Sequence, residues 1–165
     1  APSLFDRFEP RVQLDHATDD GMANAIKYAT SNPLELAIGD IQAGIDYLRS
    51  RGPVFLTGFC YGGYLTWMGA VRCEGLSAAS SYYGRLILQH MDEQPNCPII
   101  FHFGETDLHI PLDQVQAFAS KHRDLDVHIY AAGHGFVSNR TEDYDPAAEK
   151  TAMDRTLALF SANTA

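Results

Sequence analysis

One stretch of the chain places a nucleophile between glycines. Residues 58–62 fit the Gly-x-nucleophile-x-Gly pattern, with Cys60 where serine is usual. A sharp turn from a strand into a helix crowds its neighbours, so we expect Gly58 and Gly62 to be required for close approach of the two elements. The helix N-terminus would favour a thiolate, and the Tyr61 N–H would help to hold an oxyanion. The alternative is a glycine-rich turn containing a buried cysteine.

An acid and a histidine complete a possible triad. Asp107 and His134 each follow a short apolar run, and the chain order nucleophile, acid, histidine is that of the α/β-hydrolase triad. His134 would take the proton of the Cys60 thiol or hold a thiolate–imidazolium pair, and Asp107 would fix the imidazole tautomer. Asp107 could instead cap a helix beginning at Pro111, and Asp113 is a weaker rival acid.

Short apolar runs alternate with amphipathic segments, which predicts βαβ units around a parallel sheet. We expect strands at 54–57, 77–82, 99–103 and 127–130, and helices at 19–30, 33–51, 64–72, from 111 and from 146. The continuous apolar run 54–57 suits a strand buried on both faces. Asp19 or Asp20 would cap the first helix, and Asn32 the second, with Pro33 at its first position.

The last helix carries Met153, Leu157 and Phe160, which we expect to face inward. In a sheet of this kind, function gathers at the carboxyl ends of the strands. The triad candidates all fall at such ends.

Composition narrows the function classes. The chain has 165 residues, 45% of them apolar and 20% charged, which excludes a disordered tail, a collagen-like rod and a coiled coil. No apolar run reaches the ~20 residues that span a bilayer. A net charge of −9 argues against nucleic acid or an anionic membrane as the main partner.

The other sulfur and imidazole side chains suggest no metal. Cys73 and Cys97 lack metal-ligand or disulfide spacing and are expected to be buried apolar residues, which suits a reducing, cytoplasmic location. The remaining histidines share no ligand spacing. Of these, His102 is expected in the core and His109 at the border of the site. We therefore expect neither a metal nor another cofactor.

Three motifs together resemble the dienelactone hydrolases (carboxymethylenebutenolidases). They are Gly-Phe-Cys60-Tyr-Gly-Gly, Phe-His-Phe-Gly-Glu-Thr-Asp107-Leu-His-Ile-Pro and Ala-Gly-His134-Gly-Phe. The stretch Ser-Tyr-Tyr83-Gly and the opening Pro-Ser-Leu-Phe-Asp-Arg7 are also similar to family segments, so the likeness runs nearly end to end. The cysteine nucleophile makes it more specific than a general α/β-hydrolase match.

The resemblance implies cofactor-free hydrolysis of dienelactone, a carboxylate-bearing enol lactone, to maleylacetate. It also implies an arginine that binds the carboxylate, at the position of Arg7. A second family arginine lies four residues after the histidine, where this chain has Ser138; either Arg140 replaces it or the substrate differs. Phe59 and Tyr83, within the matching motifs, are further candidate substrate-binding residues.

The family's chains carry an N-terminal portion before the segment that matches Arg7, and it supplies strands and a second oxyanion donor. We therefore expect residues 1–165 to be one α/β-hydrolase domain, the C-terminal part of the fold, completed by an N-terminal segment or by self-association. The strand at Val54 would then be an exposed sheet edge. The alternatives are a broad carboxylesterase or thioesterase of the same fold, and a non-catalytic fragment or pseudoenzyme.

Overall fold

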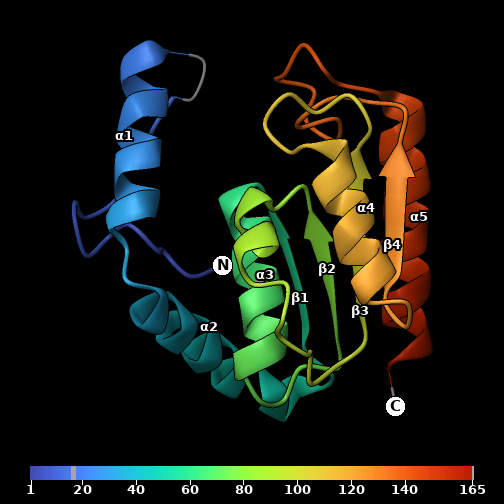
Figure 1. The fold of residues 1–165 in the computed structure, drawn as a ribbon. Helices are drawn as coiled ribbons and strands as arrows, with labels where there is room; N and C mark the ends of the chain where they lie inside the picture. The colour runs from blue at the N-terminus through green and yellow to red at the C-terminus, as the bar shows by residue number, and fades with distance from the viewer. Residues whose placement is uncertain (16–17, 165) are drawn as a thin grey trace.

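The computed structural model describes residues 1–15 and 18–164 (Figure 1). The strands are β1 (Phe55–Phe59), β2 (Ala78–Tyr82), β3 (Ile99–Gly104) and β4 (Asp126–Tyr130). The α-helices are α1 (Asp19–Ser31), α2 (Leu34–Leu48), α3 (Tyr61–Arg72), α4 (Leu112–Lys121) and α5 (Pro146–Ala162), and two 3₁₀ turns are η1 (Arg49–Arg51) and η2 (Arg85–Gln89).

The four strands form a parallel sheet in the order β1-β2-β3-β4, which is also their order along the chain. Parallel pairing brings all four carboxyl ends to one edge of the sheet. We refer to this edge, with the loops that follow the strands, as the catalytic edge. The predicted parallel sheet is confirmed, and the loops bearing Cys60, Asp107 and His134 lie together.

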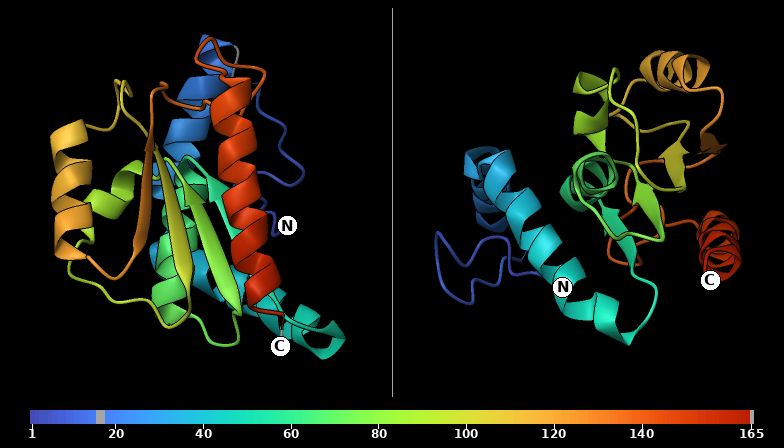
Figure 2. Two further views of the ribbon diagram at one scale, coloured as in Figure 1. Left: turned by 90° about the vertical axis from the view of Figure 1, so that its right-hand side faces the viewer. Right: turned by 90° about the horizontal axis from the view of Figure 1, so that it is seen from below.

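Helices cover both faces of the sheet. Figure 2 shows α3 and α4 on one face and α5 on the other, with α2 outside α3. The core between α3 and the sheet contains several of the largest fully buried side chains, Trp67 and Phe101 among them. The helix α2 joins this core through Ile38, Ile41 and Ile45, which recur at steps of three and four and so share one face, whereas Leu48 is exposed.

The strand β1 forms one edge of the sheet. The expectation that the apolar run 54–57 is buried on both faces is wrong, because the side chain of Thr57 is exposed and those of Phe55 and Leu56 are only half-buried. A neighbouring strand on only one side leaves part of the surface of β1 uncovered. The competing expectation, an exposed edge at this strand, agrees with the observed strand order.

Four helix beginnings differ from the sequence prediction, among them that of α4, which begins at Leu112 with Pro111 in the cap position. Thr18, rather than Asp19 or Asp20, caps α1, and its hydroxyl accepts a hydrogen bond from the Gly21 N–H. The helix α2 begins at Leu34, so Pro33 occupies the cap position assigned to Asn32. The helix α3 begins at Tyr61, three residues early, because the turn after Cys60 passes directly into helical geometry.

The inward face of α5 is rotated from the predicted one. Met153 and Leu157 are exposed, and the buried residues are Ala152 and Thr156. Phe160 is half-buried and stacks on the Phe55 ring at 4.6 Å. The rotation follows from polar contacts, because the Thr156 hydroxyl lies within hydrogen-bonding distance of several polar groups of the sheet.

We call these groups the buried polar layer: Ser80, Tyr82, His102, Tyr130 and Thr156. The Thr156 hydroxyl lies 2.8 Å from Ser80 Oγ and 2.7 Å from the Tyr82 hydroxyl. The His102 ring lies between Thr156 Oγ1, at 3.1 Å, and the Tyr130 hydroxyl, at 2.8 Å. Each member of the buried polar layer therefore has a hydrogen-bonding partner, which burial demands.

The N-terminal segment is attached to the body by aromatic rings and one ion pair. Phe5 stacks on Tyr61, and Phe8 stacks on Tyr28 of α1. Arg7 pairs with Asp40 of α2. No helix within residues 1–15 and 18–164 is long and apolar enough to cross a bilayer.

Candidate active site

The nucleophile candidate sits on a strained turn. Cys60 joins β1 directly to α3 with φ 52° and ψ −116°, outside the favourable regions for a non-glycine residue. The hydrogen bond from its N–H to the Tyr82 carbonyl (3.1 Å) holds the turn against β2. The side chain of Cys60 is exposed. Strain of this kind clusters at functional sites because the surrounding structure must enforce it.

Two glycines permit this turn, Gly58 and Gly63, whereas the sequence predicts Gly58 and Gly62. A Cβ on Gly58 would lie 2.2 Å from the Gly62 carbonyl oxygen, and a Cβ on Gly63 would lie 2.3 Å from the Tyr82 carbonyl oxygen. A Cβ on Gly62 would meet nothing within 4 Å. The expectation that Gly62 must lack a side chain is therefore wrong. It is Gly63 that lies against β2.

The structure brings Cys60, His134 and Asp107 into one line of contacts, as the sequence predicts. Cys60 Sγ lies 3.2 Å from His134 Nε2, and His134 Nδ1 lies 2.7 Å from Asp107 Oδ2. The second oxygen of Asp107 accepts hydrogen bonds from the N–H groups of His109 (2.8 Å) and Ile110 (3.2 Å). The rival acid Asp113 is exposed in the first turn of α4.

The electrostatics of His134 follow from its two neighbours. Burial alone would lower the pKa of His134, but hydrogen bonds and charge from Asp107 and Cys60 raise it to about 10. The side chain of Asp107 has no exposed surface, and its carboxylate supports a positive charge on the imidazole. The arrangement therefore favours a protonated His134 beside the sulfur at neutral pH.

The Tyr61 N–H begins α3 and is one of the N-terminal helix donors that lack an intrahelical partner. Its position after the nucleophile is that of an oxyanion donor. The Tyr61 ring contributes elsewhere, since it contacts Phe5 and its hydroxyl lies 3.5 Å from Asn32 Nδ2.

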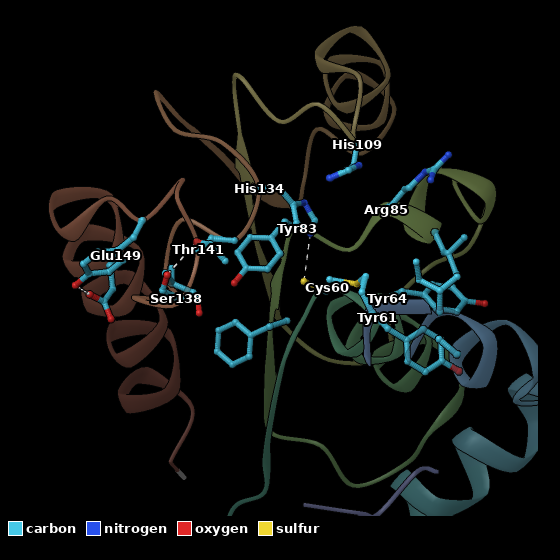
Figure 3. A pocket seen from close by; sticks show the side chains of 18 of the residues that line it. Cys60, Tyr61, Tyr64, Tyr83, Arg85, His109, His134, Ser138, Thr141 and Glu149 are labelled. Carbon is cyan, nitrogen blue, oxygen red and sulfur yellow. Dashed lines mark hydrogen bonds between the residues drawn. The ribbon is translucent and has the colours of Figure 1, made fainter. Parts of the chain in front are cut away.

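A cavity of about 900 Å³ opens beside Cys60 and His134 (Figure 3). Phe59 and Tyr83, two of the predicted substrate-binding residues, line it. Tyr83 is buried with φ 37°, and its ring lies 5.0 Å from the His134 ring. Burial and the charge of Cys60 raise the pKa of the Tyr83 hydroxyl, which keeps this wall neutral.

The two predicted substrate-binding arginines are not in the cavity wall. Arg7 is held by Asp40, and Arg140 is exposed on the loop after His134. The cavity is instead lined by Arg85, which sequence reasoning missed. The sequence did contain a signal for Arg85: it follows the end of β2 by three residues, and residues just after a parallel strand lie at the catalytic edge. His109 lines the cavity, as expected.

The helix α1 adds an apolar wall to the cavity through Met22, Ile26 and Ala29. The remaining cysteines lie away from it: Cys73 is buried and Cys97 is half-buried, where burial raises the pKa of the Cys97 thiol to about 11. Within the described residues, no group of three or more His, Cys, Asp or Glu side chains is arranged to hold a metal ion.

Comparison with known proteins agrees with the fold. The model of the dienelactone hydrolase family matches residues 1–164. This chain belongs to the dienelactone hydrolase family. It has the α/β-hydrolase fold and is a carboxylic ester hydrolase.

Individual relatives cover most of the chain. It is 30% identical over 170 residues to a carboxymethylenebutenolidase of Pseudomonas putida, and 28% identical to carboxymethylenebutenolidase 1 of Cupriavidus pinatubonensis. Each alignment covers 97% of this chain and 72% of the relative. A solved structure from Klebsiella pneumoniae, assigned as a dienelactone hydrolase, superposes with a TM-score of 0.81 at 24% identity, over 98% of this chain and 73% of that one.

Proposed function

We propose that Cys60, His134 and Asp107 form a catalytic triad that hydrolyses esters or enol lactones through a thioester intermediate. The observation that carries the proposal is the continuous line of contacts from the Cys60 sulfur through His134 to the buried carboxylate of Asp107. We propose dienelactone, opened to maleylacetate, as the leading substrate. Its support is the match to the dienelactone hydrolase family together with the carboxymethylenebutenolidase relatives.

In the first step, the Cys60 thiolate attacks the substrate carbonyl carbon, and the Tyr61 N–H stabilises the negative oxygen that forms. The C–O bond to the leaving group then breaks, and His134 gives its proton to that group. An enolate leaves readily because its charge is delocalised. The product of this half-reaction is a thioester on Cys60, with a neutral His134.

In the second step, His134 takes a proton from water, and the resulting hydroxide attacks the thioester carbon. Acylation has removed the thiolate that helps to hold a proton on His134, so the imidazole is a better base at this stage. Collapse of the intermediate releases the carboxylic acid and restores the thiolate–imidazolium pair. The thiolate requires a reduced cysteine, which fits the cytoplasm, where we place the protein.

A second candidate is broad carboxylesterase activity. Two observations favour it: Arg7 and Arg140 do not line the cavity, and α1 contributes exposed apolar side chains, Met22 and Ile26, to its wall. Both candidates use the same triad. They differ in whether a carboxylate on the substrate increases kcat/KM.

The test is hydrolysis of dienelactone and of p-nitrophenyl acetate by the purified chain beside Cys60→Ala. We expect turnover by the parent and none by the variant, with a higher kcat/KM for dienelactone. Equal activity of parent and variant would contradict the triad. Cys60 is exposed, so the variant should remain folded, and a circular dichroism melt checks this.

A further inference from the structure

The polar side chains of the cavity are divided between two sides. Figure 3 shows Arg85 and His109 on one side of Cys60, and Ser138, Thr141 and Glu149 on the other. Glu149 accepts a hydrogen bond from the Tyr144 hydroxyl at 2.7 Å, so a carboxylate stands on this second side. The cavity is therefore polarised across the nucleophile, with a cation on one side and an anion on the other.

Several arginines of the molecule already have side-chain partners. Arg7 pairs with Asp40, Arg72 pairs with Glu35, and Arg155 donates to the Tyr130 hydroxyl. Across residues 1–15 and 18–164, Arg85 has no ion pair or hydrogen bond from its side chain, and it is the only Arg or Lys lining the cavity. Its guanidinium N–H groups are thus available to a ligand, and no contact of its own would be lost on binding.

We propose that Arg85 is the specificity-determining residue of this site and binds a carboxylate on the substrate. This rests on the proposed ester hydrolase function. The planar guanidinium presents paired N–H donors that match the two oxygens of a carboxylate. A single cation also balances a single negative charge, which favours a carboxylate over a phosphate dianion.

The polarity of the cavity then fixes the orientation of the substrate. The anionic group points towards Arg85, and the Glu149 side repels it. The His109 imidazole lies next to the His134 ring, at 5.1 Å between centroids, and adds a hydrogen-bonding group on the Arg85 side. The preferred substrates are therefore monoesters of dicarboxylic acids, or lactones that carry a carboxylate.

The primary test compares an anionic and a neutral ester, mono-p-nitrophenyl glutarate and p-nitrophenyl acetate. The readout is the ratio of their kcat/KM values. We expect Arg85→Gln to lower this ratio by roughly 10- to 100-fold, the range for loss of a charge-assisted hydrogen bond. Arg85→Lys should retain part of the preference, because it keeps the charge but loses the paired donors.

Two matched variants make the result decisive. Arg123→Gln removes an exposed arginine that does not line the cavity, and it should leave the ratio unchanged. Arg140→Gln tests the arginine nearest to His134 in sequence. A fall in the ratio with Arg140→Gln but not with Arg85→Gln would overturn the proposal, as would an unchanged ratio in every variant.

A second measurement does not depend on turnover. Iodoacetate and iodoacetamide both alkylate a thiolate, forming a thioether and releasing iodide, and they differ in the carboxylate. We expect Arg85→Gln to slow alkylation of Cys60 by iodoacetate relative to iodoacetamide. If the parent hydrolyses neither ester, the proposed function fails, while this rate ratio still decides the role of Arg85. An unchanged rate ratio would contradict the proposal.

Discussion

Two histidines of this molecule have pKa values shifted in opposite directions. At the catalytic edge, burial opposes the charge of His134, but Asp107 and Cys60 raise its pKa to about 10. In the buried polar layer, burial, together with the positive charges of His128 and Arg155, lowers the pKa of His102 to about 3. Both rings have two partners within hydrogen-bonding distance. The partners' charges decide the outcome: a carboxylate and a thiolate favour imidazolium, whereas two hydroxyl groups leave the ring neutral.

The largest expected effect on activity comes from giving His134 an uncharged neighbour in place of a carboxylate, as His102 has in the buried polar layer. Asp107→Asn replaces the carboxylate beside His134 with a neutral group, so the pKa of His134 should fall and its tautomer should no longer be fixed. We expect kcat to fall by roughly 10³- to 10⁴-fold. The measurement is ester hydrolysis, with Asp113→Asn as the control. A loss below tenfold would show that the carboxylate is not needed.

The second prediction concerns how the two regions are built. The catalytic edge depends on backbone contact, so Gly58→Ala forces a Cβ to within 2.2 Å of the Gly62 carbonyl oxygen and should cost about 3 kcal/mol or more of unfolding free energy. Gly62→Ala is the matched control and should change stability by less than about 1 kcal/mol. Urea unfolding measures both. Similar losses for the two variants would contradict the packing described for the turn.

The third prediction uses pH to separate the two histidines. An unfolded chain protonates histidine near pH 6.5, but His102 in the fold has a pKa of about 3, so the unfolded state binds more protons between these values. The stability from a neutral His102 is present above pH 6.5 and is lost as the pH falls. We expect a loss of about 2 kcal/mol between pH 6.5 and pH 5.

Urea unfolding of the parent and His102→Gln at both pH values isolates this contribution, because other groups titrate equally in the two proteins. The variant should lack this part of the acid loss. An identical pH dependence would show that His102 does not cause it. For His134 the sign is reversed: its pKa is raised, so its contribution is full below pH 6.5 and is lost as the pH rises towards 10.

The smallest expected effect tests the hydroxyl that organises the buried polar layer. Thr156→Val keeps the shape but removes the group shared by Ser80, Tyr82 and His102. We expect a loss of about 1–2 kcal/mol of unfolding free energy, because buried polar atoms lose a partner. Thr151→Val, on an exposed part of the same helix, should change stability by less than about 0.5 kcal/mol. Equal effects would show that the shared hydroxyl is unimportant.

The sequence predicts the elements of the catalytic edge well. Alternation of short apolar runs with amphipathic helices fixes the parallel sheet, and a parallel sheet places the loops of Cys60, Asp107 and His134 at one edge. The nature of each loop follows from local spacing. For these reasons, the placement of the three side chains needs little information beyond the chain order.

Long-range contacts explain what the sequence does not predict. The inward face of α5 is set by Thr156, whose partners lie more than 50 residues away. Gly63 is required by contact with β2, and Arg7 is withdrawn from the cavity by Asp40 on α2. Periodicity and motif spacing describe residues that are close in sequence, so they cannot predict such distant partners. Arg85 is predictable only in part. Its place after β2 indicates that it lies at the catalytic edge, but nothing in the sequence indicates that its side chain lacks a partner.

The agreement between strand order and chain order has a consequence for folding. Because β1, β2, β3 and β4 pair with their neighbours in sequence, the sheet can grow by addition of one strand at a time, with each loop closed over a short length of chain. The Cys60–His134 contact, by contrast, spans 74 residues and forms only once β4 has docked. In a refolding experiment, the reactivity of the Cys60 thiol would therefore show when β4 packs onto the sheet.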